Sequence, residues 1–527
     1  MFTTHLILGG GFAGWAMAQR LAKSKQQVAL VSEENYATFQ PMLPEVIGGE
    51  LSPLHVVTPL RELCKPATII KGAVLSVDTV NKKVVVQTSD FTKLTLTYEH
   101  LTLALGSKTD LSRTPGMTEH AFMLQNAMDA TRIRNEVLTR LESGQWEENP
   151  LRKKRLLTFV VVGGGYSGVE VAGQIQDLIN NSHRTYPNLL QGEAKVILIH
   201  GRDLLLPTLD KRLGKAAENI LRKNGVDIRL NERVNAVTAT AVFTSSEAYH
   251  NTYEANTVIC TIGNSINPII KTLAKEHNYA LEGTRLIVDK FSYIPNTEIK
   301  AIGDCGVLTS YTKKGDLVCP PTAQFAYRIG RWAADNVLRK LKNVEEKTFT
   351  FTGLGELAAI GHHQAVGQVF GFKLTGFICW WLWRTVYLMK LPGLDRKINV
   401  GMNWGLHLFY PRETSVVSPK YTKFTGAQHL ESGDKLFTAG DPVFSLYLIK
   451  KGRIKCTRVD GAVAYVTAGG TLGYNNLSNG VKCWDYEAVA EEATELVSMT
   501  KDTFLPFKDA LKVVPPKFVE PEVMETT

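Results

Sequence analysis

The sequence predicts an α/β protein that contains two similar strand–turn–helix units, and two glycine patterns carry this prediction. Each pattern has the spacing G-x-G-x-x-G and follows directly after an apolar run that reads as a β-strand. Glycines at this spacing allow a tight turn, a close approach of the backbone to a ligand, and close packing of helix on strand. Two such units, about 150 residues apart, predict a protein that binds two dinucleotides. The glycines are Gly9, Gly11 and Gly14 in the first unit and Gly163, Gly165 and Gly168 in the second.

The elements of the first unit follow from apolar spacing that changes from a strand period to a helical period. The charged stretch 147–155 interrupts this pattern and is predicted to be a linker. In chain order, we expect a strand at 6–8, a helix at 12–23, a strand at 27–32, β-rich sequence at 68–97 and a helix at 128–142.

The second unit starts at about residue 156 and repeats this order of elements. After Pro268 the chain returns to sequence typical of the first unit, which predicts that one dinucleotide-binding domain is inserted in the other. The expected elements are helices at 168–180 and 210–223 and strands at 195–199, 227–230, 257–263, 286–288 and 300–304.

Composition, net charge and cysteine spacing limit the classes of protein to which the chain can belong. Of the 527 residues, 21% are charged and 44% hydrophobic, which is typical of a globular protein. The net charge of +9 favours an anionic partner, and in the absence of a nucleic-acid recognition motif we expect anionic lipid instead of nucleic acid. A mild basic excess spread over the whole chain without a functional meaning is the equal alternative. The seven cysteines contain no C-x-x-C pair, which argues against a metal site and predicts a reducing compartment. Met1 lies so close to the first strand that we expect no signal peptide.

Several further segments resemble the type II NADH:quinone oxidoreductases, within the two-dinucleotide-binding-domain flavoproteins. The resemblance covers about residues 5–410 and is more specific than the glycines alone. It rests on the segments 35–44 (NYATFQPMLP), 303–304 (GD), 320–326 (PPTAQFA), 351–361 (FTGLGELAAIG) and 403–404 (NW).

The resemblance implies FAD in the first unit, with Gly106, Gly303 and Asp304 as contacts in addition to the first glycine set. An acidic residue at the end of the second strand normally binds the adenine ribose, but Ser32 stands there and Glu33 follows it. Because side chains alternate along a strand, Glu33 is expected to point away and Ser32 to make a single hydrogen bond.

The second unit is expected to bind NADH or NADPH, with Gly263 as a further contact. A carboxylate at the end of its second strand would indicate NADH, but His200 stands there, with Arg202 two residues later. This pair favours a 2′-phosphate, although Arg202 is equally typical of a solvated loop charge. The choice between the two nucleotides therefore stays open.

Three residues are implied at the reacting rings. The resemblance places Glu170 beside nicotinamide and flavin, where it positions the rings, because hydride transfer needs no acid or base. Ala323 and Gln324 are implied on the quinone side, where a small residue lets the ring approach and an amide bonds a quinone oxygen. No cysteine pair follows the first unit, as a disulfide reductase would need, and Cys260 and Cys305 are expected to be buried thiols.

Residues 370–390 are rich in aromatic side chains, and the apolar run is shorter than the ~20 residues that span a membrane. This pattern predicts a helix that lies in the membrane surface, and a buried packing helix is the alternative. Trp and Tyr favour the interface, and basic residues bind anionic headgroups. The expected lipid contacts are Trp380, Trp381, Trp383 and Arg384.

The segment 433–455 resembles a cyclic-nucleotide-binding β-roll. The family's phosphate cassette is degenerate here: 472–474 read LGY, and Trp484 stands at the arginine position. Without a cation to pair the phosphate, cyclic nucleotide binding is doubtful and the ligand of the roll is unknown. Docking, dimerisation or another ligand is the expected use.

Together these patterns predict two Rossmann-like domains, the NAD(P) domain inserted in the FAD domain, then an amphipathic membrane-anchoring region and an all-β roll. The expected function is an FAD-dependent, non-proton-pumping NAD(P)H:quinone oxidoreductase, peripheral on the cytoplasmic side of the inner (cell) membrane. A soluble flavin reductase with a protein carrier and a redox-sensing interaction protein are the alternatives, and a homodimer stays open. The expected boundaries are 1–120 and 267–345 (FAD), 150–266 (NAD(P)H), 346–412 (membrane), 418–512 (roll) and 513–527 (tail).

Overall fold

The computed structural model describes residues 1–505 and 508, apart from 183, 247–248, 314, 362, 408, 411, 417–424 and 482. The predicted tail lies outside the described residues. The chain divides into two compact units. The first comprises residues 1–110, 125–131 and 262–412, and the second comprises 111–124, 132–261 and 413–527.

The described part of the first unit is built on a seven-stranded sheet in the order β5-β2-β1-β8-β7-β6, with β21 paired to β8. Its central strands are parallel and buried, as expected where helices cover a sheet, while β6 and β7 form an antiparallel edge. The strands are β1 (Phe2–Leu8), β2 (Val28–Ser32), β5 (Thr68–Lys71), β6 (Ala73–Asp78), β7 (Lys83–Gln87), β8 (Lys93–Leu103) and β21 (Lys300–Ala301).

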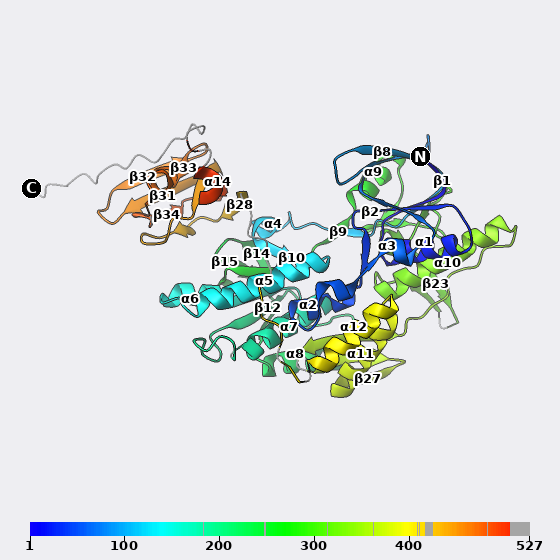
Figure 1. The fold of residues 1–527 in the computed structure, drawn as a ribbon, viewed down its shortest axis with the longest axis horizontal. Helices are drawn as coiled ribbons and strands as arrows, with labels where there is room; N and C mark the ends of the chain where they lie inside the picture. Colours follow the sequence, from blue (N-terminus) through cyan, green and yellow to red (C-terminus); the bar gives the residue numbers. More distant parts are fainter. Residues whose placement is uncertain are drawn as a thin grey trace, which may run out of the picture. The chain divides into compact units, whose positions relative to one another are not determined.

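Two helices of this unit lie side by side (Figure 1). These are α1 (Phe12–Lys23), which follows the first glycine loop, and α10 (Ala323–Leu341). They approach closely because Gly330 faces the backbone of Ala13, where a Cβ would lie only 2.9 Å from the Ala13 carbonyl carbon. The short 3₁₀ helix η3 (Gly303–Cys305) contacts both helices, so the fold gathers three predicted FAD segments.

The C-terminal part of the first unit is a three-stranded antiparallel sheet followed by two helices. Residues 370–390 therefore form a hairpin strand and one helix, because Gly376 adopts φ +81° and ends the strand before the helix begins. None of the helices in the described ranges is long and apolar enough to cross a bilayer. The elements are β25 (Gly355–Gly361), β26 (Gln364–Val369), β27 (Phe372–Gly376), α11 (Phe377–Lys390) and α12 (Leu394–Leu406).

The second unit contains a five-stranded parallel sheet in the order β10-β17-β11-β12-β13. It also contains α6 (Pro150–Leu156) where a linker was predicted, because Asn149 caps the helix by accepting from the Leu151 and Arg152 amides. Its other elements are β10 (Ala121–Met123), β11 (Thr158–Val162), α7 (Tyr166–Ser182), β12 (Lys195–His200), α8 (Lys211–Lys223), β13 (Asp227–Leu230), β14 (Arg233–Val237), β15 (Ala241–Ser245), β16 (His250–Glu254) and β17 (Thr257–Cys260).

The predicted β-roll is present in the described residues as two four-stranded sheets, in the orders β28-β35-β30-β33 and β29-β34-β31-β32. Apolar residues from both sheets fill the space between them. The strands are β28 (Thr425–Leu430), β29 (Lys435–Phe437), β30 (Ser445–Lys451), β31 (Arg453–Arg458), β32 (Val463–Thr467), β33 (Thr471–Leu472), β34 (Tyr486–Ala490) and β35 (Thr494–Thr500).

Candidate functional site

The first glycine loop joins β1 to α1 and leaves an open space at its middle glycine. Gly9 has φ +111°, and a Cβ on Gly14 would collide with the Gly9 carbonyl oxygen. A Cβ on Gly11, in contrast, would have no atom within 4 Å. No acidic residue stands in the first turn of α1, so its N-terminal amides present positive potential to this space. The loop therefore has the form of an anion cradle.

Ser32, at the end of β2, is the side chain that faces this loop. It is buried and packs on Gly10, where a Cβ would lie 2.8 Å from the Ser32 Cβ. Glu33 is exposed, and its carboxylate binds the Lys108 ammonium at 2.9 Å. Because side chains alternate along β2, the Ser32 hydroxyl faces the loop and the Glu33 carboxylate does not.

The segment Gly303–Cys305 lies beside the start of α1. Gly303 has φ +70°, and a Cβ at this position would lie 3.0 Å from the Ala13 Cβ. Burial raises the pKa of Asp304, and the Arg285 guanidinium partly opposes this shift. Ala323 is the first residue of α10, which contacts the same segment.

The Gln324 amide is held by the backbone where β25 begins. Its Nε2 donates to the Gly355 carbonyl at 3.2 Å, and its Oε1 accepts from the Leu354 amide at 3.2 Å. The amide was predicted to bond a quinone oxygen, and the second N–H of Nε2 is the group that such an oxygen would use, because the other N–H already has a backbone partner.

The second glycine loop, in the second unit, repeats the geometry of the first. Gly163 has φ +114°, and a Cβ on Gly168 would collide with the Gly163 carbonyl oxygen. A Cβ on Gly165 would again have no atom within 4 Å. His200 ends β12 and packs on Gly164 as Ser32 packs on Gly10, so the two side chains hold equivalent places.

The remaining predicted contacts are distributed as follows. Glu170 is buried in α7. Gly106 and Gly263 directly precede the paired strands β9 (Ser107–Thr109) and β18 (Asn264–Ile266), both within the first unit. Cys260 and Cys305 are buried, and burial raises the pKa of the Cys305 thiol to about 11, as expected for an unreactive cysteine.

Three of the four predicted lipid contacts are wrong. Trp380, Trp383 and Arg384 are buried, with Trp383 only 1% exposed, and only Trp381 is exposed, at 59%. The Arg384 guanidinium stacks on Trp380 at 4.1 Å and on Trp404 at 4.6 Å. This face of α11 is buried because Arg384 pairs with carboxylates that lie more than 300 residues earlier in the chain.

Those carboxylates belong to Glu45 and Glu50, two buried residues that the sequence did not single out. Arg384 pairs with Glu50 through a short contact and lies 3.7 Å from a Glu45 oxygen. Arg412 binds the other Glu50 oxygen at 2.6 Å, and the Trp404 indole donates to Glu45 at 2.9 Å. The four charged residues form a buried ion cluster that joins α2 (Leu43–Ile47) and the residues after it to α11 and the segment after α12, and the Trp404 hydrogen bond adds α12.

With this geometry in place, comparison with known proteins identifies the family. A model of the family described as "Pyridine nucleotide-disulphide oxidoreductase" matches residues 3–330. The chain belongs to this family. Models described as "NDH2 C-terminal domain" and "Cyclic nucleotide-binding domain" match residues 354–413 and 427–509.

Relatives of this flavoprotein confirm the resemblance to type II NADH dehydrogenases and the enzyme class. It is 29% identical over 453 residues to the mitochondrial external NADH-ubiquinone oxidoreductase 2 of Saccharomyces cerevisiae, covering 78% of this chain and 82% of that protein. It is 25% identical to the type II NADH:quinone oxidoreductase Ndh of Mycobacterium tuberculosis, covering 76% and 86%. The structure of NDH2 from Plasmodium falciparum in complex with NADH has the same fold, with a TM-score of 0.72, 22% identity and coverage of 78% and 99%.

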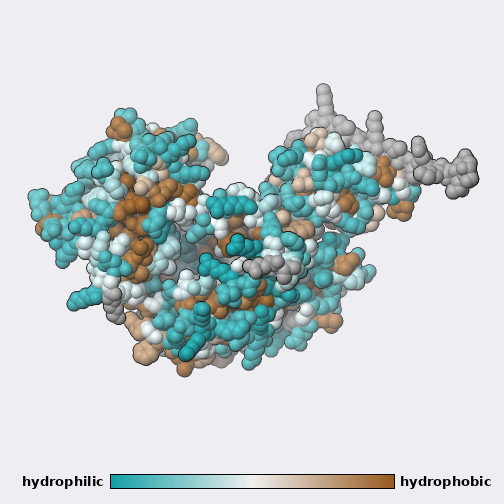
Figure 2. Space-filling view, turned by 180° about the vertical axis from the view of Figure 1, so that it is seen from behind, coloured by the Kyte–Doolittle hydropathy of each residue, from teal (hydrophilic) through white to brown (hydrophobic). Residues whose placement is uncertain are grey.

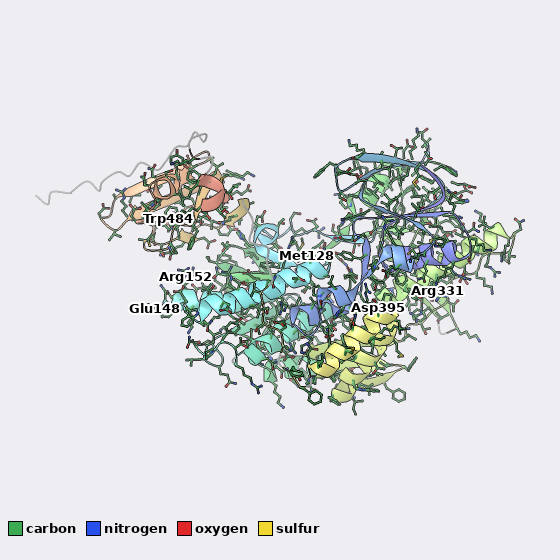
Figure 3. The ribbon with its side chains drawn as sticks, in the orientation of Figure 1. Met128, Glu148, Arg152, Arg331, Asp395 and Trp484 are labelled. Atoms are coloured by element: carbon green, nitrogen blue, oxygen red, sulfur yellow. The ribbon has the colours of Figure 1, made fainter. Side chains whose placement is uncertain are left out.

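The β-roll of this family member has an aromatic interior. Trp484, labelled in Figure 3, is 3% exposed and stacks on Phe437 with ring centroids 3.7 Å apart. A Cβ on Gly473, in the degenerate cassette, would lie 2.8 Å from the Trp484 ring. The residue at the arginine position therefore packs into the core of the roll and cannot pair a phosphate.

Replacing Glu45 with glutamine is expected to remove a pH dependence of stability. Burial, with the Glu50 charge adding to it, raises the pKa of Glu45 to about 8, against Arg384 and the Trp404 hydrogen bond. A carboxyl with a raised folded pKa stabilises the fold below its unfolded pKa of 4.5, and this contribution is lost as the pH rises through 8. Between pH 6 and pH 9 the Tm of the unmodified protein should therefore fall by roughly 2–6 °C more than that of Glu45→Gln.

Thermal melts at four pH values across this range measure the difference. Glu148→Gln, which removes a carboxylate from an exposed position, serves as the control and should follow the unmodified protein. Parallel Tm curves for Glu45→Gln and the unmodified protein would contradict the shifted pKa.

Proposed function

We propose that the protein is an FAD-dependent NAD(P)H:quinone oxidoreductase that does not pump protons and lies on the membrane surface. The observation that carries the proposal is the repeated cradle, because both middle glycines border open space at the start of a helix. The first cradle, with Gly303 and Asp304 beside it, fits the flavin nucleotide. The second fits the nicotinamide nucleotide. FAD, when bound, takes a hydride from NAD(P)H and delivers the electrons to quinone.

The residues of the chain supply binding, orientation and exclusion of water. The helix amides at both cradles hold pyrophosphate groups, and Ser32 donates one hydrogen bond at the ribose end of FAD. Glu170, which is buried, positions the nicotinamide instead of acting as a base. On the quinone side, Ala323 leaves room for the ring, and the Gln324 amide, fixed by Leu354 and Gly355, directs its second N–H at a quinone oxygen.

Membrane attachment is proposed to use the exposed side of the β27–α11–α12 region, in place of the residues expected from the sequence. Figure 2 shows that apolar side chains reach the surface in patches on the face it draws. Lys373 and Lys390 are exposed in the same region and would meet anionic headgroups. The patch is formed by Phe370, Phe372, Phe377, Ile378, Trp381, Met389, Leu394, Ile398, Met402 and Leu406, all of which are exposed.

The cytoplasmic side of the inner (cell) membrane stays the proposed location, and docking stays the proposed use of the β-roll. Within the second unit, the His429 amide of β28 donates to the His120 ring at 2.9 Å, next to β10 of the nucleotide-binding sheet. This contact supports a docking role, since it ties the roll to its own nucleotide-binding domain. The homodimer stays a prediction.

Anaerobic titration of the purified protein with NADH and NADPH separately, followed by a soluble quinone, tests the function. Bleaching of the flavin absorbance by either donor and its recovery on adding quinone are expected. Bleaching without recovery would favour a flavin reductase that uses a protein carrier. Tight nucleotide binding with negligible turnover would favour a redox-sensing protein.

A further inference from the structure

His200 places its imidazole ring at the end of β12, beside the second cradle. Its Nδ1 accepts a hydrogen bond from the Gly164 amide at 3.0 Å, so the neutral ring carries its proton on Nε2. Burial, with Arg202 adding to it, lowers the pKa of His200 and keeps the ring neutral. Nε2 is buried and makes no hydrogen bond of good geometry in the described residues, and the Leu204 backbone lies near enough to the ring to raise its pKa in opposition to burial. A buried donor without a good acceptor is unfavourable, and a ligand oxygen that reached this N–H would supply the acceptor.

Positive charge gathers beside this N–H, and one of its sources is a residue the sequence did not reveal. The Arg233 side chain lies across Gly201, where a Cβ would be 2.9 Å from its Cγ and 3.5 Å from its Nε. Arg202 follows directly, and both arginines are exposed.

Two carboxylates adjoin the arginines in the chain, Asp203 after Arg202 and Glu232 before Arg233, and Glu232 is turned to other partners. Glu232 is buried, and its oxygens accept from the Thr244 hydroxyl at 3.1 Å and the Tyr253 hydroxyl at 2.8 Å. Asp203 is an exposed carboxylate that also faces His200. The exposed charges near His200 are therefore the Asp203 carboxylate and the guanidinium groups of Arg202 and Arg233.

We propose that this end of the second cradle accepts a 2′-phosphate, so that NADPH is the preferred reductant; the inference rests on the proposed function. In this fold the adenine ribose lies at the end of the second strand, where His200 stands. A carboxylate there would accept from the 2′-hydroxyl and repel a phosphate, whereas an N–H donor and two guanidinium groups bind phosphate oxygens. His200 donates one hydrogen bond, and Arg233 and Arg202 supply the charge.

Calorimetric binding of 2′,5′-ADP and 5′-AMP to the purified full-length protein tests the subsite without turnover. The unmodified protein should bind 2′,5′-ADP at least about tenfold more tightly, and Arg202→Gln/Arg233→Gln should reduce this ratio to about threefold or less. His200→Glu should reverse the preference. Lys223→Gln removes one cation at the far end of α8 and should leave the ratio unchanged.

Comparing nucleotide binding with quinone turnover tells a failure of the proposed phosphate subsite from a failure of the proposed function. A preference for 2′,5′-ADP without turnover on any quinone would leave the subsite in place and overturn the proposed function. Turnover with NADH, together with equal or tighter binding of 5′-AMP, would keep the function and overturn the subsite. Failure of both probes to bind would also overturn the subsite.

Discussion

Gly11→Ala is expected to give a folded protein that no longer retains flavin, and Gly165→Ala a yellow protein that nucleotides no longer reduce. Neither added methyl group meets a protein atom within 4 Å, so the fold should tolerate both. Each methyl group enters the space proposed for a pyrophosphate, which needs close backbone approach. Flavin content should fall to about a tenth or less in the first variant, and in the second the nucleotide Kd should rise roughly a hundredfold.

Absorbance at the flavin maximum and stopped-flow reduction measure these two losses. Gly14→Ala and Gly168→Ala are the informative contrasts, because their methyl groups collide with the Gly9 and Gly163 carbonyl oxygens and should lower the Tm as well. If Gly11→Ala kept full flavin content, the assignment of the first cradle would fail. If Gly165→Ala lost flavin instead, the two cradles would be interchanged.

Phe372→Glu combined with Trp381→Glu is expected to release the protein from membranes. These side chains are 74% and 59% exposed, so the changes remove apolar contact area and add charge that anionic lipid repels, without opening a cavity. In flotation with anionic vesicles, the bound fraction should fall about tenfold or more. Turnover with a long-chain quinone should fall with it, while turnover with a short soluble quinone stays within about twofold.

Val80→Glu combined with Phe91→Glu is the matched control, since both residues are exposed in the first unit outside the proposed patch. This variant should float like the unmodified protein. Equal flotation of all three proteins would remove the basis for surface attachment through β27 and α11.

Local pattern predicted the glycine-loop units closely, because the residues that decide them are neighbours in the chain. Helix α1 has the predicted bounds, and β13 covers the predicted residues. The error at α6 was also local: charged residues suggested a linker, although the Asn-Pro pair at its start is a helix-cap signal. The Asn149–Pro150 pair is visible in the sequence, but the linker was predicted from the charged composition of the segment instead.

Which side of α11 is exposed could not be predicted in the same way. Both sides of α11 carry aromatic residues, so spacing alone does not show which side turns inward. Glu45 and Glu50 decide it, and they lie more than 300 residues earlier in the chain. The sequence also did not reveal Arg233 as a site residue. Its side chain reaches Gly201 because β14 contacts β12, which is a tertiary contact that local sequence does not show.

The buried ion cluster bears on how the protein would attach to a bilayer. Glu50, Arg384 and Arg412 already fasten α11 and the segment after α12 to the residues that follow α2, so the patch proposed to face lipid would be assembled before it met a membrane. Attachment would then not require this segment to fold, so the conformational entropy lost on binding would be smaller. Such a preassembled surface favours reversible residence, in which one molecule visits many vesicles during its lifetime.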